Sequence, residues 1–138
     1  MSKGLKTVCI VIAVLLAIAI AAVAAFKMRY KKMAANLTAE YNNITVCDTA
    51  KIPDGVYEGS FKDFLVNVKV SVEVKKHRIK NVTIKEQFAG KGYEALDTTE
   101  RIVKAQNPKV DTVTGATGSS MGIMIAAHRA LNSAHDGK

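Results

Sequence analysis

The stretch that decides the fold is VNVKVSVEVK, residues 66–75. Valine occupies every even position and a polar residue every odd position, so the pattern has a period of two. Successive side chains of a β-strand point to opposite faces, and this stretch therefore predicts a strand with one apolar face and one wet face. A sheet that faces water on one side is typical of antiparallel pairing. The sequence predicts an antiparallel sheet built around this strand.

The neighbouring segments predict the rest of the sheet and two helices. Residues 79–87 return as a strand after a turn at Lys76-His77, and residues 56–61 form a short strand beforehand. Helices are predicted over residues 94–107 and about 120–133. Strands followed by helices indicate an α+β fold, in which a small antiparallel sheet of about three to four strands carries two packed helices.

Spacing also predicts which side chains face the core. The returning strand is expected to point Val82 and Ile84 inward, and a short extended piece is expected over residues 110–113. Side chains three or four residues apart share one face of a helix. The inward residues expected on the two helices are, in order, Leu96, Thr99 and Val103, and Met121, Met124, Ile125 and Leu131.

An uncharged apolar run, residues 8–26, precedes the predicted domain. As a helix it would be about 29 Å long, enough to cross the hydrocarbon of a bilayer. The chain has 138 residues, which excludes a large two-domain enzyme, and no second run of this length suggests a multi-pass transporter. We expect an N-terminal tail (1–7), a transmembrane anchor or uncleaved signal (8–26), a stalk or linker (27–53) and one domain (54–138).

Charge flanking the run leaves its orientation open. Ala22-Val23-Ala24 resembles a signal-peptidase site, although the run is longer than the usual apolar core of a signal peptide, which favours a retained anchor. Lys3 and Lys6 precede the run, and four basic residues lie within 27–32. Positive-inside counting is nearly balanced, with a slight lean to a cytoplasmic domain. The basic residues after the run are expected to contact lipid headgroups.

The chemistry of the chain is concentrated in DTVTGATGSS, residues 111–120. Its glycines permit backbone conformations that a Cβ would block, and a serine at 119 or 120 is expected to cap the following helix. The free N–H groups of a helix N-terminus favour an anion. The hydroxyls of Thr114 and Thr117 lie beside that position, and Asp111 is close enough in sequence to orient one of them. The segment predicts either a phosphate site with a nucleophilic hydroxyl or a capped turn without a ligand.

These residues also resemble a known family. Asp111-x-x-Thr114-Gly115-Ala116-Thr117 is similar to D-x-x-[S/T]-G-A-[T/S], the flavinylation motif of the FMN-binding domain family. The family occurs in the C subunit of the sodium-translocating NADH:quinone reductase, in the G subunit of the Rnf complex and in small membrane-anchored proteins. The resemblance covers roughly residues 54–131 and includes the opening DGVYEG. The chain departs from the family at the turn Lys76-His77, where a glycine is usual.

The resemblance implies a cofactor, a maturation enzyme and a location. Thr117 would carry FMN through a phosphoester that a separate Mg²⁺-dependent flavin transferase makes from FAD. Asp111 would assist the transfer, while Thr114, Gly115 and Ala116 would shape the turn. The domain would be held at the cell membrane by a single span, on the extracytoplasmic side.

The implied function is electron transfer, because the flavin supplies the redox chemistry and needs no catalytic acid or base from the protein. The donor would be a membrane reductase linked to quinol or NADH, and the acceptor would be extracytoplasmic. The chain is thus expected to be an electron-transfer flavoprotein or redox subunit rather than a stand-alone enzyme. Tyr93 or Phe88 could pack against the flavin ring, although a place in the core or on the surface is the simpler interpretation.

Other functions fit the sequence less well. GSSMG, residues 118–122, matches the nucleophile elbow of serine hydrolases, but no histidine follows the only later acid, Asp136. The three histidines are scattered without metal-ligand spacing, and no basic stripe with stacking aromatics suggests nucleic-acid binding. The remaining alternative is a membrane-anchored binding module of the same fold that carries no flavin.

Overall fold

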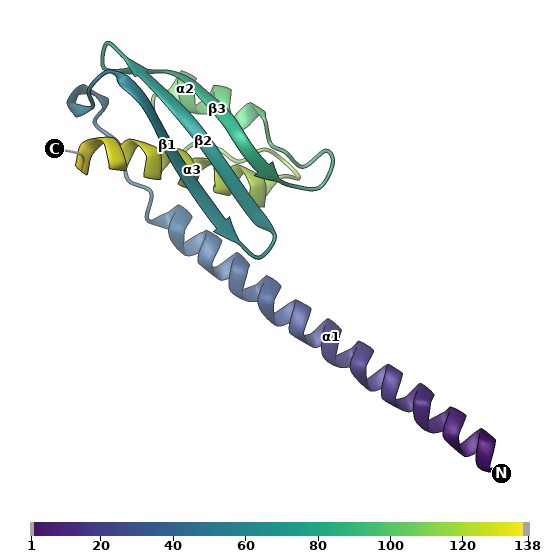
Figure 1. The fold of residues 1–138 in the computed structure, drawn as a ribbon. Coiled ribbons are helices and arrows are strands. Elements are labelled where there is room, and N and C mark those ends of the chain that lie inside the picture. Colours follow the sequence, from purple (N-terminus) through teal and green to yellow (C-terminus); the bar gives the residue numbers. More distant parts are fainter. Residues whose placement is uncertain (1, 137–138) are drawn as a thin grey trace. The chain divides into compact units, whose positions relative to one another are not determined.

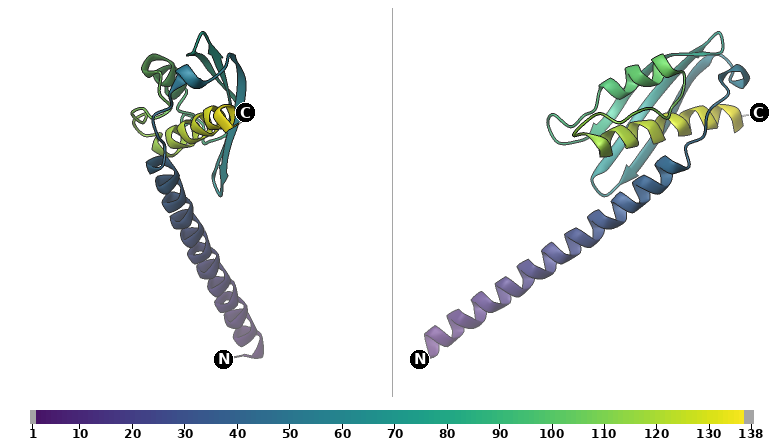
Figure 2. Two further views of the ribbon diagram at one scale, coloured as in Figure 1. Left: turned by 90° about the vertical axis from the view of Figure 1, so that its left-hand side faces the viewer. Right: turned by 180° about the vertical axis from the view of Figure 1, so that it is seen from behind.

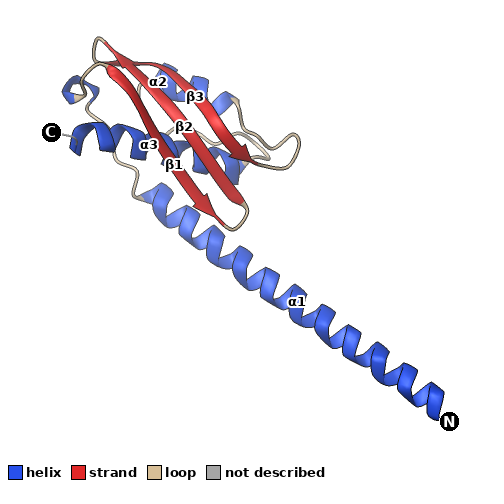
Figure 3. Cartoon of the chain, in the orientation of Figure 1, coloured by secondary structure: helices blue, strands red, loops and turns tan. Residues whose placement is uncertain are grey.

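The computed structural model describes residues 2–136, so Met1 and residues 137–138, the outer ends of the predicted tail and domain, lie outside the described residues. The chain divides into two compact units, with the boundary between Lys32 and Met33. One long helix, α1 (Lys3–Asn42), belongs to both units. The elements are coloured along the chain in Figure 1 and by type in Figure 3.

The first unit is the N-terminal part of α1. Its side chains are exposed throughout, including those of the apolar run 8–26, and the most apolar 18-residue window of the helix has a mean hydropathy of 3.2. An apolar helix of this length could cross a membrane, a property that signal sequences near an N-terminus share. The structure therefore supports the predicted membrane helix.

The second unit contains a three-stranded antiparallel sheet in the order β1-β2-β3. The strands are β1 (Gly55–Asp63), β2 (Val66–Lys75) and β3 (Arg78–Phe88). The valines of β2 are all buried, and those at its centre are fully so. The α+β class, the antiparallel pairing and the buried valine face are confirmed.

The turn between β2 and β3 forms without a glycine. Lys76 and His77 both have positive φ, 52° and 59°, as the two central residues of a type I′ hairpin turn require. This turn matches the right-handed twist of the flanking strands. The predicted turn is confirmed, and the glycine that the family usually has there is replaced by two residues that adopt the left-handed conformation.

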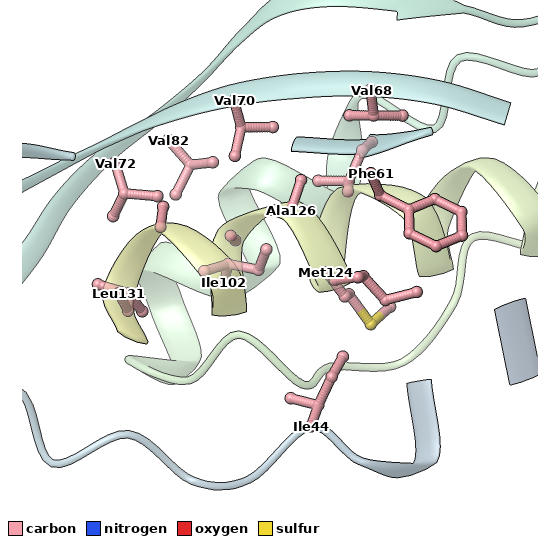
Figure 4. Packing of buried hydrophobic residues seen from close by; sticks show 14 of the residues in the cluster. Ile44, Phe61, Val68, Val70, Val72, Val82, Ile102, Met124, Ala126 and Leu131 are labelled. Atoms are coloured by element: carbon pink, nitrogen blue, oxygen red, sulfur yellow. The ribbon is translucent and has the colours of Figure 1, made fainter. Parts of the chain in front are cut away.

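Two helices, α2 (Asp97–Ala105) and α3 (Thr117–Asp136), cover the apolar face of the sheet (Figure 2). The valines of β2 point toward α3 in Figure 4, and Ala126 of that helix points back toward them. The inward face predicted for α2 is wrong at Leu96, which is 62% exposed because it precedes the helix. Thr98 and Ile102, one turn apart, are fully buried instead.

The last turns of α1 are part of the second unit. Met33 and Leu37 are buried in its core, although they lie in the segment expected to form a stalk or linker. Polar contacts flank them: Glu40 pairs with Arg129 of α3 at 3.2 Å, and the Asn36 amide donates to Asp63 at 3.0 Å. Residues 33–42 thus belong to the folded unit.

His128 of α3 joins this helix to the segment after α1. The backbone N–H of Thr45 donates to Nε2 of His128 at 3.4 Å, so this nitrogen must be an unprotonated acceptor. The side-chain amide of Asn132 lies 3.3 Å from the same atom. Burial lowers the pKa of His128 below its ordinary value of 6.5, an effect that Glu40 opposes and Arg129 reinforces.

We expect acid to weaken the second unit through His128. A histidine with a lowered folded-state pKa binds its proton less readily in the folded than in the unfolded chain. Stability should therefore fall as the pH drops below about 6.5 and level off below the folded-state pKa, as urea midpoints between about pH 7.5 and 5.5 would show. His128→Gln should flatten this slope. A His128→Gln variant that keeps the wild-type slope would contradict the assignment.

Candidate functional site

The predicted motif lies in the connection between α2 and α3. This connection follows Ala105 and ends where α3 begins, at Thr117. Residues 110–113, expected to be extended, do not join the sheet, whose three strands all come earlier in the chain. The motif therefore belongs to a surface loop beside the sheet's helical layer, the kind of segment that carries binding groups in many folds.

A tight turn precedes α3. The N–H of Ala116 donates to the carbonyl of Val113 at 3.0 Å, which closes a four-residue β-turn. Its third residue, Gly115, has a φ of 79°, a conformation that side chains rarely adopt. Ala116 is buried, whereas Thr114 and Gly115 are exposed. The turn gives Gly115 a specific role and fixes the path of the chain into the helix.

Thr117 is the first residue of α3, and its side chain is exposed. The N–H of Ser120 makes the first helical bond to the carbonyl of Ala116, at 2.9 Å. The N–H groups of the first turn, which begins at Thr117, have no partner within the helix and carry the positive end of its dipole. An exposed hydroxyl thus lies at a helix terminus that favours a bound anion.

The predicted serine cap is wrong. The helix begins at Thr117 rather than near Ser120, so Ser119 and Ser120 both lie inside it. Ser120 is fully buried, and its Oγ donates to the carbonyl of Ala116 at 2.8 Å. The same oxygen accepts the N–H of Val113 at 2.9 Å. A hydroxyl in this environment is not available as a nucleophile, which excludes the hydrolase interpretation of GSSMG.

Asp111 lies at the edge of a basic groove. The groove has a volume of about 790 Å³ and is lined by Tyr41, Arg101, Lys104, Ala105, Lys109, Val110 and Asp111. The ammonium of Lys109 lies over the ring of Tyr41, 4.7 Å from its centroid. Three cations and a single carboxylate give this surface a positive potential. Asp111 itself is exposed.

One contact beside the motif was not predicted from the sequence. Nη1 of Arg101, on α2, donates to the backbone carbonyls of Asp111 and Thr112 at 3.0 and 3.1 Å. The sequence offers no signal for this contact, because neither the spacing nor the residue type of Arg101 distinguishes it from other basic residues on a helix. The two aromatic residues considered as flavin neighbours, Phe88 and Tyr93, are more than half exposed, which excludes the core for both.

The comparison with protein families matches residues 65–132 to the model of the FMN-binding domain. These residues belong to the FMN-binding domain family. The match includes the turn, Asp111 and Thr117, so the loop described above is part of the FMN-binding domain. The resemblance that the motif indicated is thereby confirmed.

Similarity to a solved structure supports the fold of this FMN-binding domain. The chain is similar to the CPE2226 protein from Clostridium perfringens, with 22% identity and a TM-score of 0.51, over 63% of this chain and 92% of that one. The comparison with curated proteins gives no match.

The residues of the loop suit the phosphate of FMN. Thr117 offers an exposed hydroxyl, the first turn of α3 offers N–H groups, and Gly115 presents no side chain to an approaching group. Phosphate groups bind at helix N-termini for these reasons in many proteins. The donor set therefore fits the cofactor that the family name implies.

Proposed function

We propose that this protein carries FMN covalently on Thr117 and acts as an electron carrier anchored in the cell membrane. The observation that supports it most directly is the exposed hydroxyl of Thr117 at the first position of α3, within the region matched by the FMN-binding family. When bound, the flavin supplies reversible electron transfer, and the protein supplies attachment, orientation and surroundings.

The chain's own groups have defined roles in attachment. The Thr117 oxygen forms the new bond to the phosphorus next to the riboflavin moiety of FAD, and the bond to AMP breaks. Asp111 accepts the proton that the hydroxyl loses, and the first-turn amides of α3 stabilise the charge on the phosphodiester. The partner that catalyses this step is a Mg²⁺-dependent flavin transferase.

A denaturing gel tests the proposal. Full-length protein co-expressed with a flavin transferase should keep flavin fluorescence after denaturation and gain the mass of one FMN less one water. Protein made without the transferase should show neither signal. A covalent bond survives unfolding, whereas bound FMN is lost, so the gel distinguishes the two. If the wild-type protein never gains flavin with an active transferase, the proposal is wrong. A membrane-anchored binding module without flavin would then describe the protein better.

Removing the Asp111 carboxylate should slow the loading of flavin. Asp111→Asn keeps the size of the side chain but cannot accept a proton, so we expect loading to slow by about a hundredfold. Initial rates of flavin incorporation with purified transferase measure this effect. Asp54→Asn, at an exposed acid before β1, is the control and should load at the wild-type rate. Equal rates for both variants would remove Asp111 from the reaction.

The proposal also places the domain outside the cytoplasm, with the N-terminus inside, despite the basic residues after Phe26. In a Cys47→Ser background, Ser133→Cys should react with a membrane-impermeant maleimide in intact cells. Ser2→Cys, on the other side of the apolar run, should react only after the membrane is permeabilised. The reverse pattern would place the domain in the cytoplasm. With the domain outside the cytoplasm, we propose a membrane reductase linked to quinol or NADH as the electron donor and an extracytoplasmic acceptor.

A further inference from the structure

The loop with Asp111 and Thr117 is held at its upstream end by α2. Nη1 of Arg101 donates to two consecutive carbonyls, those of Asp111 and Thr112. These bonds fix the peptide plane that follows Asp111, and so the direction in which the Asp111 side chain leaves the backbone. Arginine suits this task because its guanidinium is planar and always charged.

The helix that carries Arg101 is itself fixed to the sheet. Ile102, the next residue, is fully buried. At the end of α2, the side-chain amide of Gln106 bonds to both the N–H and the carbonyl of Ile79 in β3, each at 2.8 Å. The helix that carries the guanidinium is therefore fixed to the sheet. The hydrogen bonds of Arg101 connect the loop to this helix and, through it, to the core.

The downstream end of the loop is held by Ser120. Its Oγ accepts the N–H of Val113 and donates to the carbonyl of Ala116, so one hydroxyl joins the two ends of the turn that contains Gly115. Ser120 lies one turn into α3 from Thr117. The bridge thus fixes the turn directly before the hydroxyl that reacts in the proposed function.

We infer that Arg101 and Ser120 are positioning residues for flavin transfer, although neither lies in the motif of residues 111–117. Between them they bind three consecutive residues, 111–113, and the residue before Thr117. Transfer requires a carboxylate and a hydroxyl on an exposed loop to be held together in one geometry, and such positioning strongly affects reaction rates. The role of these residues in flavin transfer rests on the proposed function, whereas their role in holding the loop does not.

Hydrogen exchange of the flavin-free, full-length protein tests the structural part. Ser120→Ala removes the acceptor of the Val113 N–H, and Arg101→Gln removes both upstream bonds. We expect exchange at Val113 and Ala116 to accelerate at least about tenfold in each variant, with exchange in β2 unchanged. The controls are Ser133→Ala, whose hydroxyl donates to the carbonyl of Ala130 in the same helix, and Lys62→Gln, which removes an exposed cation from β1. If both test variants exchanged the amide hydrogens of Val113 and Ala116 at the wild-type rate, the inference would be wrong.

Transfer kinetics test the functional part. With saturating FAD, both test variants should lower kcat for loading at least about tenfold, because a misplaced hydroxyl reacts slowly even when the transferase has bound the domain. The controls should keep the wild-type kcat. Arg101→Lys should recover part of the rate, since an ammonium can still bond to a carbonyl. If Ser120→Ala does not fold, Arg101→Gln alone decides the result.

The outcomes separate this inference from the proposed function. Suppose that the wild type loads flavin, and that the test variants load it at the wild-type rate although their loops exchange faster. The positioning role is then wrong, and the proposed function stands. If the wild type never loads flavin, the proposed function and the positioning role both fail, and the exchange data then describe only how the loop is held.

Discussion

Thr117→Ala is expected to abolish covalent flavin completely while leaving the domain folded. The substitution removes the oxygen that forms the phosphoester, and no remaining group of the side chain can replace it. Because Thr117 is exposed at the first position of α3, its replacement by alanine leaves no cavity. Alanine is also a good helix former. Flavin fluorescence on a denaturing gel and the far-ultraviolet circular dichroism spectrum measure the two parts of this result.

Two neighbouring variants make the Thr117 result specific. Thr117→Ser restores a hydroxyl at the same position and should restore covalent flavin. Thr114→Ala removes the other exposed hydroxyl of the motif and should leave covalent flavin in place. If Thr117→Ala remained fluorescent after denaturation, another residue would have to be the acceptor, and a peptide map of the labelled protein would identify it.

Gly59→Ala is expected to prevent stable folding of the second unit. Gly59 lies in β1 where the strand passes close to α3, and a Cβ there would overlap the carbonyl oxygen of Ala126. It would also lie 2.5 Å from the backbone nitrogen of Ala130. Backbone atoms cannot move aside as a side chain can, so strand and helix would have to separate. We expect a loss of at least about 4 kcal/mol, a large part of the stability of a small domain.

The control for Gly59 is another glycine that contacts a neighbour normally. A Cβ at Gly118 would have its nearest neighbour, Cδ2 of Leu37, at 3.7 Å, which is an ordinary contact. Gly118 lies within α3, so Gly118→Ala should preserve or slightly raise stability through helix propensity. Urea unfolding followed by circular dichroism compares the two variants. Similar midpoints would show that β1 and α3 approach less closely than described.

The sheet could be predicted because its signals are local. Five alternating valines can bury only one face, and this pattern fixed β2 at the residues observed. The family was predictable for a similar reason, since the residues of the motif that indicated it are close together in the sequence. Their positions in the structure were less predictable, because the helix begins at Thr117 rather than near Ser120 and because Ser120, which bridges the turn with Gly115, lies outside the motif.

The less accurate predictions depended on contacts between distant segments. The spacing of α2 allowed a face with Leu96 or a face with Ile102, and only packing on the sheet decides between them. Met33 and Leu37 were assigned to a stalk or linker because the core that buries them forms from residues much later in the chain. Arg101 contacts residues ten and eleven positions away through their backbone, which leaves no pattern of side chains to detect.

The order of the elements along the chain has a consequence for the timing of maturation. The strands pair in sequence order, and the turns that join them are short, so the hairpins can form early and quickly. Their valine face stays uncovered until α3, which follows all three strands, packs on it. Thr117 begins that helix, and its position is therefore set only by the step that completes the core. A transferase that requires this geometry would act on finished domains and pass over incomplete ones.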